Sequence, residues 1–155
     1  MDGTVRQLLD IKGSHVSTAH VNLSLLECAI MMKSKKIGSL LIVDKGELIG
    51  ILHEREISRR GVCENKDMES TPVSAIMNRE FAVVSPLTSI MDAMAIINTQ
   101  CVRHLPVLDQ GDIVGVISIG DLTHWVLSLQ QEDIRHLVDY INGTHQLDDG
   151  DDVGF

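Results

Sequence analysis

The sequence predicts an α+β fold built from two similar halves that pack around a pseudo-twofold axis. Residues 24–57 align without a gap with residues 89–122, at an offset of 65 positions (89 − 24). Each copy carries apolar residues at helical spacing, followed by a nearly continuous apolar run typical of a buried strand. A glycine turn, a second strand and another helix follow, so each half is predicted to have the order β-α-β-β-α.

The segment boundaries follow from this repeat. We assign residues 1–62 to the first repeat and residues 63–127 to the second, whose opening residues 63–70 form a polar linker. Residues 128–142 are predicted to form a separate C-terminal helix, and residues 143–155 an acidic tail without fixed structure. The dipeptide Asn-Gly at the end of that helix is the expected stop.

Each copy is predicted to open with a short extended segment, at residues 15–19 and 82–86. A helix follows, with Ser24 or Ser89 as its N-cap and an acidic residue three positions later, the spacing of a capping box. Pro106 lies inside a predicted strand and indicates an edge or a bulge there.

The linker is predicted to end in a short helix that Thr71 and Pro72 open, because proline is favoured in the first turn of a helix.

Composition excludes several classes of function. The 155 residues include 13 basic and 22 acidic side chains, a net charge of -9, which argues against nucleic acid as the main partner. Apolar residues make up 44% of the chain, yet no apolar run approaches the ~20 residues that span a bilayer. The three cysteines form no Cys-x-x-Cys pair and fit a reducing compartment. We expect a cytoplasmic protein with no membrane partner.

Two matching segments carry a family resemblance. KKIGSLLIVDKGELIGILHEREI and VRHLPVLDQGDIVGVISIGDL resemble the two halves of a cystathionine-β-synthase (CBS) domain pair, also called a Bateman module. The resemblance covers about Val5 to Leu127 and implies two repeats packed through their sheets, with two symmetry-related clefts between them. Such pairs commonly form homodimers.

The resemblance implies a regulatory protein rather than an enzyme. Its ligand would be an adenosyl compound: AMP, ADP, ATP, NAD or S-adenosylmethionine, with AMP or ATP first among them and no catalytic cofactor. The ligand state would be passed to a regulated protein partner that the sequence does not identify. The alternative is a constitutive dimeric interaction module whose clefts are vestigial.

The resemblance assigns the ligand to the motif that runs from Gly115 to Asp121. Asp121 would bind the ribose hydroxyls, Ser118 the ribose or phosphate, and Gly120 would allow close backbone approach next to Ile117. Asp121 could equally cap the helix that follows, and the two roles are compatible.

The opposite repeat is implied to supply the adenine wall of the same cleft. Ile37, Gly38 and Ser39 hold that position, together with Ser17 and Thr18 from the preceding extended segment.

Basic residues are the implied phosphate contacts. The resemblance gives this role to Arg103 and His104, and Arg55 could also point inward. Arg103 could instead be a solvated strand end, and His104 a histidine packed at the repeat interface.

The second cleft departs from the family pattern. His53 stands where Ser or Thr is usual, and Glu56 where Asp is usual. We therefore expect this cleft to be weak, blocked or differently selective, unless it never bound a ligand. The seven histidines show no metal-ligand spacing, so no metal site is expected.

Overall fold

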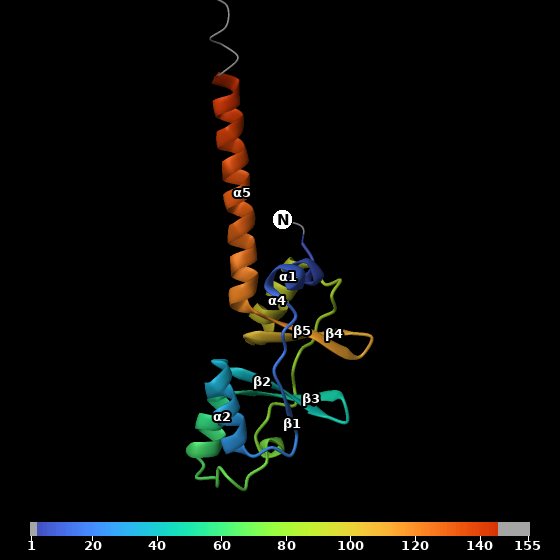
Figure 1. The fold of residues 1–155 in the computed structure, drawn as a ribbon, viewed down its shortest axis with the longest axis vertical. Helices are drawn as coiled ribbons and strands as arrows, with labels where there is room; N and C mark the ends of the chain where they lie inside the picture. Colours follow the sequence, from blue (N-terminus) through green and yellow to red (C-terminus); the bar gives the residue numbers. More distant parts are fainter. Residues whose placement is uncertain (1–2, 146–155) are drawn as a thin grey trace, which may run out of the picture.

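The structure is a computed structural model that describes the backbone of residues 3–145 and the side chains of residues 3–140. Two small sheets lie one above the other, each flanked by helices, and a long helix extends away from the body (Figure 1). The α+β architecture with two repeats is therefore confirmed. The predicted tail, from residue 146 onward, lies outside the described residues.

The first half contains a three-stranded sheet. Its strand order is β1-β2-β3, with β1 parallel to β2 and β3 antiparallel to it. Its elements are β1 (Thr18–His20), α2 (Leu25–Lys35), β2 (Ser39–Asp44), β3 (Glu47–His53), α3 (Glu54–Glu56) and the π-helical turn η1 (Ile57–Val62).

The second half repeats this layout with a two-stranded antiparallel sheet. Val84 forms an isolated parallel bridge with Val107, in the place that β1 takes beside β2. The elements are the 3-10 turn η2 (Val73–Ala75), α4 (Ile90–Gln100), β4 (His104–Asp109), β5 (Asp112–Ser118) and α5 (Ile119–His145).

Both predicted helix caps are confirmed. The Ser24 hydroxyl accepts from the Glu27 N–H at 3.1 Å, and the Glu27 carboxylate accepts from the Ser24 N–H at 2.7 Å, which completes a capping box. In α4 the Ser89 hydroxyl accepts from the Asp92 N–H at 3.0 Å. The shorter Asp92 carboxylate instead accepts from the Ser89 hydroxyl at 2.7 Å.

Two helix predictions differ from the structure. The helix predicted after Pro72 is only the single 3-10 turn η2. Its residue Val73, with Ile76 and Met77 just after it, packs into the core of the first half. The C-terminal helix is not separate: α5 runs unbroken through 27 residues, and Asn142-Gly143 does not end it. No proline and no glycine stands between Asp121 and Asn142, so nothing interrupts the helical hydrogen bonds.

A bulge occurs near Pro106, but the proline is not its cause. The register of β4 and β5 shifts between Val107 and Leu108. The same shift occurs between Ile42 and Val43 in the first half, which has a leucine at the position of Pro106. The bulge therefore belongs to the repeated architecture.

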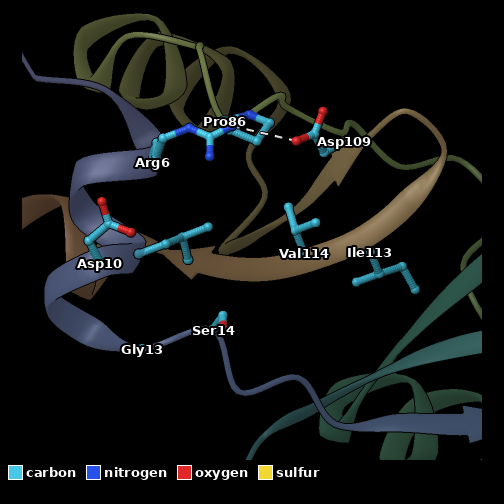
Figure 2. Close-up of a pocket in the computed structure, with 9 residues that line it drawn as sticks. Arg6, Asp10, Gly13, Ser14, Pro86, Asp109, Ile113 and Val114 are labelled. Carbon is cyan, nitrogen blue, oxygen red and sulfur yellow. Dashed lines mark hydrogen bonds and ion pairs between the residues drawn. The ribbon is translucent and has the colours of Figure 1, made fainter.

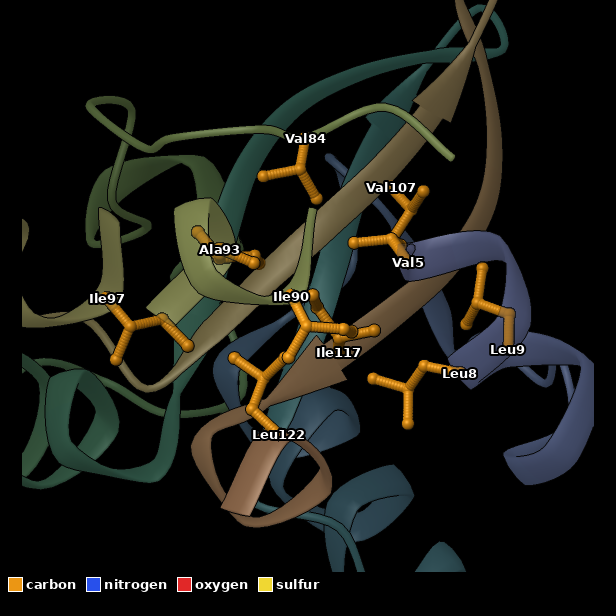
Figure 3. Packing of buried hydrophobic residues seen from close by; sticks show 11 residues of the cluster. Val5, Leu8, Leu9, Val84, Ile90, Ala93, Ile97, Val107, Ile117 and Leu122 are labelled. Carbon is orange, nitrogen blue, oxygen red and sulfur yellow. The ribbon is translucent and has the colours of Figure 1, made fainter. Parts of the chain in front are cut away.

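The two halves exchange their N-terminal segments. Helix α1 (Val5–Lys12) packs Val5, Leu8 and Leu9 into the core of the second half, and the chain then crosses beyond Gly13 to the first half (Figures 2 and 3). Conversely, the segment 73–77 packs Val73, Ile76 and Met77 into the core of the first half.

Gly50 and Gly115, which hold equivalent positions in β3 and β5, leave room for these crossing segments because they have no side chain. A Cβ on Gly50 would lie 2.6 Å from the Met77 sulfur and 3.2 Å from the Asn78 carbonyl oxygen. A Cβ on Gly115 would lie 2.7 Å from Leu9. Ile51 and Asn78 exchange two backbone hydrogen bonds at 2.8 and 2.9 Å, which bring the crossing segment onto the strand.

Adding one methyl group at this contact should destabilise the fold. Gly50→Ala is expected to lower the free energy of unfolding by about 1–3 kcal/mol, because the Asn78 backbone would have to move. Urea unfolding followed by circular dichroism measures the change. Gly120→Ala is the control, since its Cβ meets only the Ser118 hydroxyl at 3.6 Å in the first turn of α5. Equal stability of the Gly50 variant and the native chain would contradict the proposed contact.

Cys28 should be inert to alkylation while the chain is folded. Its side chain is fully buried, and burial, with a smaller effect of Glu27, raises the pKa of the thiol to about 11. Cys63 and Cys101 are exposed. Iodoacetamide at pH ~8 should therefore modify two cysteines natively and all three in urea, as read by mass spectrometry. Rapid modification of Cys28 in the native chain would show that its surroundings open readily.

Candidate functional site

One hollow of the described surface is larger than the predicted site and lies elsewhere. It has a volume of about 610 Å³ and lies between α1 and the β4–β5 hairpin, as Figure 2 shows. Arg6 and Asp109 form an exposed ion pair across it at 3.5 Å. It contains none of the residues that the sequence singled out, and exposed ion pairs of this kind contribute little to stability or binding.

A smaller cleft of about 270 Å³ lies between the two halves and contains Asp121. It brings together seven of the predicted residues: Ser17, Ile37, Gly38, Ser39, His104, Ser118 and Asp121. These come from the segment before β1, from the residues before and at the start of β2, from the paired ends of β4 and β5, and from the first turn of α5.

The two oxygens of the Asp121 carboxylate have different surroundings. Oδ2 accepts from the Ser118 N–H at 2.7 Å, from the Ser118 hydroxyl at 2.8 Å and from Lys12 Nζ at 2.5 Å. The Asp121 N–H donates back to the Ser118 hydroxyl at 3.2 Å, so the carboxylate also caps the start of α5. Within the described residues Oδ1 accepts no hydrogen bond, and Asp121 lines both this cleft and a hollow of about 380 Å³ between α1 and α5.

Asp121 stays ionised near neutral pH. Burial alone would raise the pKa of its carboxyl group, but hydrogen bonds from Lys12 and Ser118 outweigh burial and hold the pKa below its usual range. The site therefore presents a fixed negative charge whose position three donors determine.

Five residues that line this cleft were not predicted: Lys12, His15, Val16, Leu41 and Val116. Strand alternation could have found two of them, because Leu41 lies two residues after Ser39 and Val116 two residues before Ser118. No sequence pattern places Lys12 beside Asp121, since they are 109 residues apart.

Five predicted residues do not line the cleft, and three of them line neither this cleft nor the second one. Ile117 is fully buried in the second core, because neighbouring strand residues point to opposite faces. Thr18 alternates in the same way with Ser17 and is exposed. Gly120 lies in the first turn of α5 and is not among the residues that line the cleft.

Arg55 and Arg103 lie in the second cleft instead of the Asp121 cleft. This cleft measures about 340 Å³. Its lining residues are Gly38, His53, Glu54, Arg55, Arg59, Asn78, Val102, Arg103 and His104. Gly38 and His104 line both clefts, which therefore share a wall.

Glu56 is already satisfied by its own half. One carboxylate oxygen accepts from the His53 N–H at 3.0 Å and lies 3.2 Å from the His53 ring nitrogen. The other accepts from Arg55 Nε at 3.2 Å. The Glu56 side chain is only 12% exposed, so neither oxygen is left to bind a ribose as Asp121 Oδ1 could.

Two histidines from opposite halves meet at the shared wall. The ring centroids of His53 and His104 lie 5.6 Å apart. The His104 Nδ1 atom is buried and has no hydrogen-bond partner among the described residues. Burial is the main cause that lowers the pKa of both rings, and for His104 the nearby His53 lowers it further.

Comparison with known proteins decides the family. The CBS domain model matches residues 9–62 and 73–128. The chain belongs to the CBS domain family. It is 34% identical over 113 residues to the CBS domain-containing protein YhcV of Bacillus subtilis, covering 73% of this chain and 80% of the relative.

Solved structures agree with this assignment. The CBS domain protein NE2398 has a TM-score of 0.78 and 38% identity, covering 82% of this chain and 99% of that one. The CBS domain pair of MJ0100, solved in complex with 5′-methylthioadenosine and S-adenosyl-L-methionine, has a TM-score of 0.73. It is 23% identical over 83% of this chain and 98% of that one, a likeness that concerns the fold.

Two further findings apply to the part of this CBS pair that the structure describes. No helix there has the length and apolar character needed to cross a bilayer. Nor do its described histidine, cysteine and acidic side chains gather in groups of three that could hold a metal ion.

The buried histidine pair should make the CBS pair sensitive to mild acid. His53 and His104 have folded-state pKa values below the ordinary 6.5, so the unfolded chain takes up protons first as the pH falls. This part of the stability is present above about pH 6.5 and is lost progressively below it. The charged groups facing the rings are Arg55, Glu56 and Arg103, with Lys12 and Asp121 beside His104.

Urea unfolding at pH ~7.5 and pH ~5.5 measures this loss. Changing both His53 and His104 to Gln should reduce the difference between the two conditions, whereas His136→Gln on the exposed part of α5 should not. Asp121 and Glu56, whose pKa values are lowered, act in a separate window below about pH 4.5. An unchanged acid response in the double variant would contradict the assignment.

Proposed function

We propose that this CBS pair binds an adenosyl ligand in the Asp121 cleft and signals its presence to a protein partner. The observation that carries the proposal is the difference in hydrogen bonding between the two oxygens of the Asp121 carboxylate. Oδ2 is fixed by Ser118 and Lys12, while Oδ1 has no hydrogen-bond donor among the described residues of a chain in which Asp121 lines the cleft. A carboxylate held in this way can accept hydrogen bonds from the hydroxyls of a ribose.

The walls of the cleft suit a purine base. Val16, Ile37, Leu41 and Val116 supply aliphatic surface from both halves. Ser17 and Ser39 line the same cleft as Ser118, and a serine hydroxyl can contact a sugar or a phosphate as donor or acceptor. Apolar walls with a few converging polar groups are typical of small-molecule sites.

The volume of the cleft favours a ligand with one nucleoside. About 270 Å³ lies near the lower end of the ~300–1,000 Å³ range of ligand pockets, so AMP, ATP or S-adenosylmethionine fits better than the dinucleotide NAD. The related MJ0100 domain pair was solved with 5′-methylthioadenosine and S-adenosyl-L-methionine, which supports an adenosyl ligand here as well.

The signal would pass through the two helices that meet at Asp121. Lys12 ends α1, and Asp121 lies in the first turn of α5. A ligand hydrogen-bonded to Oδ1 shares the carboxylate charge with Lys12 on Oδ2, and a ligand that weakens this ion pair favours one arrangement of the helices over another. This role requires no catalysis, and we propose a regulatory module that acts as a homodimer.

The second candidate is a constitutive dimeric interaction module with vestigial clefts. The self-satisfied pair of His53 and Glu56 favours it for one cleft. The free Oδ1 of Asp121 favours ligand binding for the other. The two candidates differ in a simple test, because a vestigial module shows no thermal shift with any adenosyl compound at millimolar concentration.

Removal of the carboxylate should abolish most of the affinity for adenosine. Asp121→Ala is expected to weaken binding about 10–100-fold, the effect of losing a charge-assisted hydrogen bond of ~1.5–3 kcal/mol. Calorimetric titration with adenosine, AMP, ATP and S-adenosylmethionine provides the measurement. Glu56→Ala is the matched control in the equivalent position and should leave the affinity unchanged. Native affinity in the Asp121 variant would show that the ligand binds elsewhere.

A further inference from the structure

The two clefts have equivalent backbones. Gly38 and Arg103 hold the same place, since the Gly38 carbonyl accepts from Glu54 N–H and the Arg103 carbonyl from Ile119 N–H, both at 3.1 Å. The strand pairs agree, because Ser39 pairs with His53 in the first sheet as His104 pairs with Ser118 in the second.

The side chains at these equivalent positions have opposite chemistry. Ser39 and Ser118 line only the Asp121 cleft, whereas His53, the equivalent of Ser118, lines only the second. Gly38 and His104 line both clefts, and Arg103, the equivalent of Gly38, lines only the second. Arg55 likewise stands where α5 has Gly120. The aliphatic wall is also reduced, since Val102 is the one aliphatic side chain among the residues that line the second cleft. A purine has little surface to pack on there.

Three exposed arginines line the second cleft, and only one of them has a carboxylate partner among the described residues. Arg55, Arg59 and Arg103 line it, against the single carboxylate of Glu54. Arg55 uses its Nε on Glu56, but within the described part of the chain the side chains of Arg59 and Arg103 make no hydrogen bond or ion pair. This is unusual in a chain of net charge -9, where carboxylates are plentiful.

We propose that the second cleft is a separate site for a small polyanion of the pyrophosphate class, with no nucleoside attached. Guanidinium groups bind phosphate oxygens through paired N–H donors, and three of them around about 340 Å³ suit a ligand with two or more phosphoryl groups. His104, which lines both clefts, has a buried Nδ1 with no hydrogen-bond partner among the described residues. The inference does not rest on adenosyl binding at Asp121.

Calorimetric titration of the full chain with sodium pyrophosphate, in low-salt buffer free of divalent cations, tests the proposal. We expect one equivalent to bind and the affinity to fall as salt is added. Arg103→Gln should weaken binding about 10–100-fold. Arg135→Gln on the exposed part of α5 is the matched control and should bind as the native chain does. Arg59→Gln is a second test that stands if the Arg103 variant folds poorly by circular dichroism.

The same variants separate this site from the adenosyl site. Asp121→Ala should retain pyrophosphate binding, and Arg103→Gln should retain whatever affinity the native chain has for adenosine, which carries no phosphate. Absence of pyrophosphate binding at millimolar concentration would overturn the proposal. So would native pyrophosphate affinity in the Arg103 and Arg59 variants, or loss of that affinity in Asp121→Ala.

Discussion

The exchange of N-terminal segments is the constraint on which the rest of this structure depends. Helix α1 completes the core around Ile117 and Leu122, while the segment 73–77 completes the core around Leu40 and Leu52. Neither half buries its apolar face without residues from the other half. The exchange fixes the two sheets against each other, and both clefts lie where the sheets meet.

Within this symmetric frame, the two clefts have diverged through a few side chains. Asp121 and Glu56 occupy equivalent positions and both receive hydrogen bonds at a helix start. The extra methylene of Glu56 lets it reach both the His53 ring and Arg55, so its two oxygens are occupied. Asp121 is shorter and receives its donors on one oxygen. The backbone is conserved between the halves, but the chemistry offered to a ligand is not.

Local sequence patterns predicted most of the elements and part of the site. The apolar periodicity and the serine caps placed α2, α4 and the four long strands, and the family motif placed Ser118 and Asp121 in a cleft. The patterns could not show which core α1 joins. An amphipathic pattern predicts that one face of a helix is buried, but it does not identify the element on which that face packs. For the same reason Lys12 was missed. Arg55 and Arg103 were placed in the wrong cleft because a cleft built from two repeats exists only after they have packed.

The unbroken helix α5 gives small movements at the cleft a large reach. Its 27 residues span about 40 Å, at 1.5 Å per residue, and its first turn contains Asp121. From residue 130 to residue 140 every residue is exposed. A tilt of about 5° at the base of a rigid α5 would displace its far end by about 3.5 Å, comparable to the length of a hydrogen bond. Geometry of this kind amplifies an ångström-scale change at one carboxylate into a displacement that a docked protein could sense.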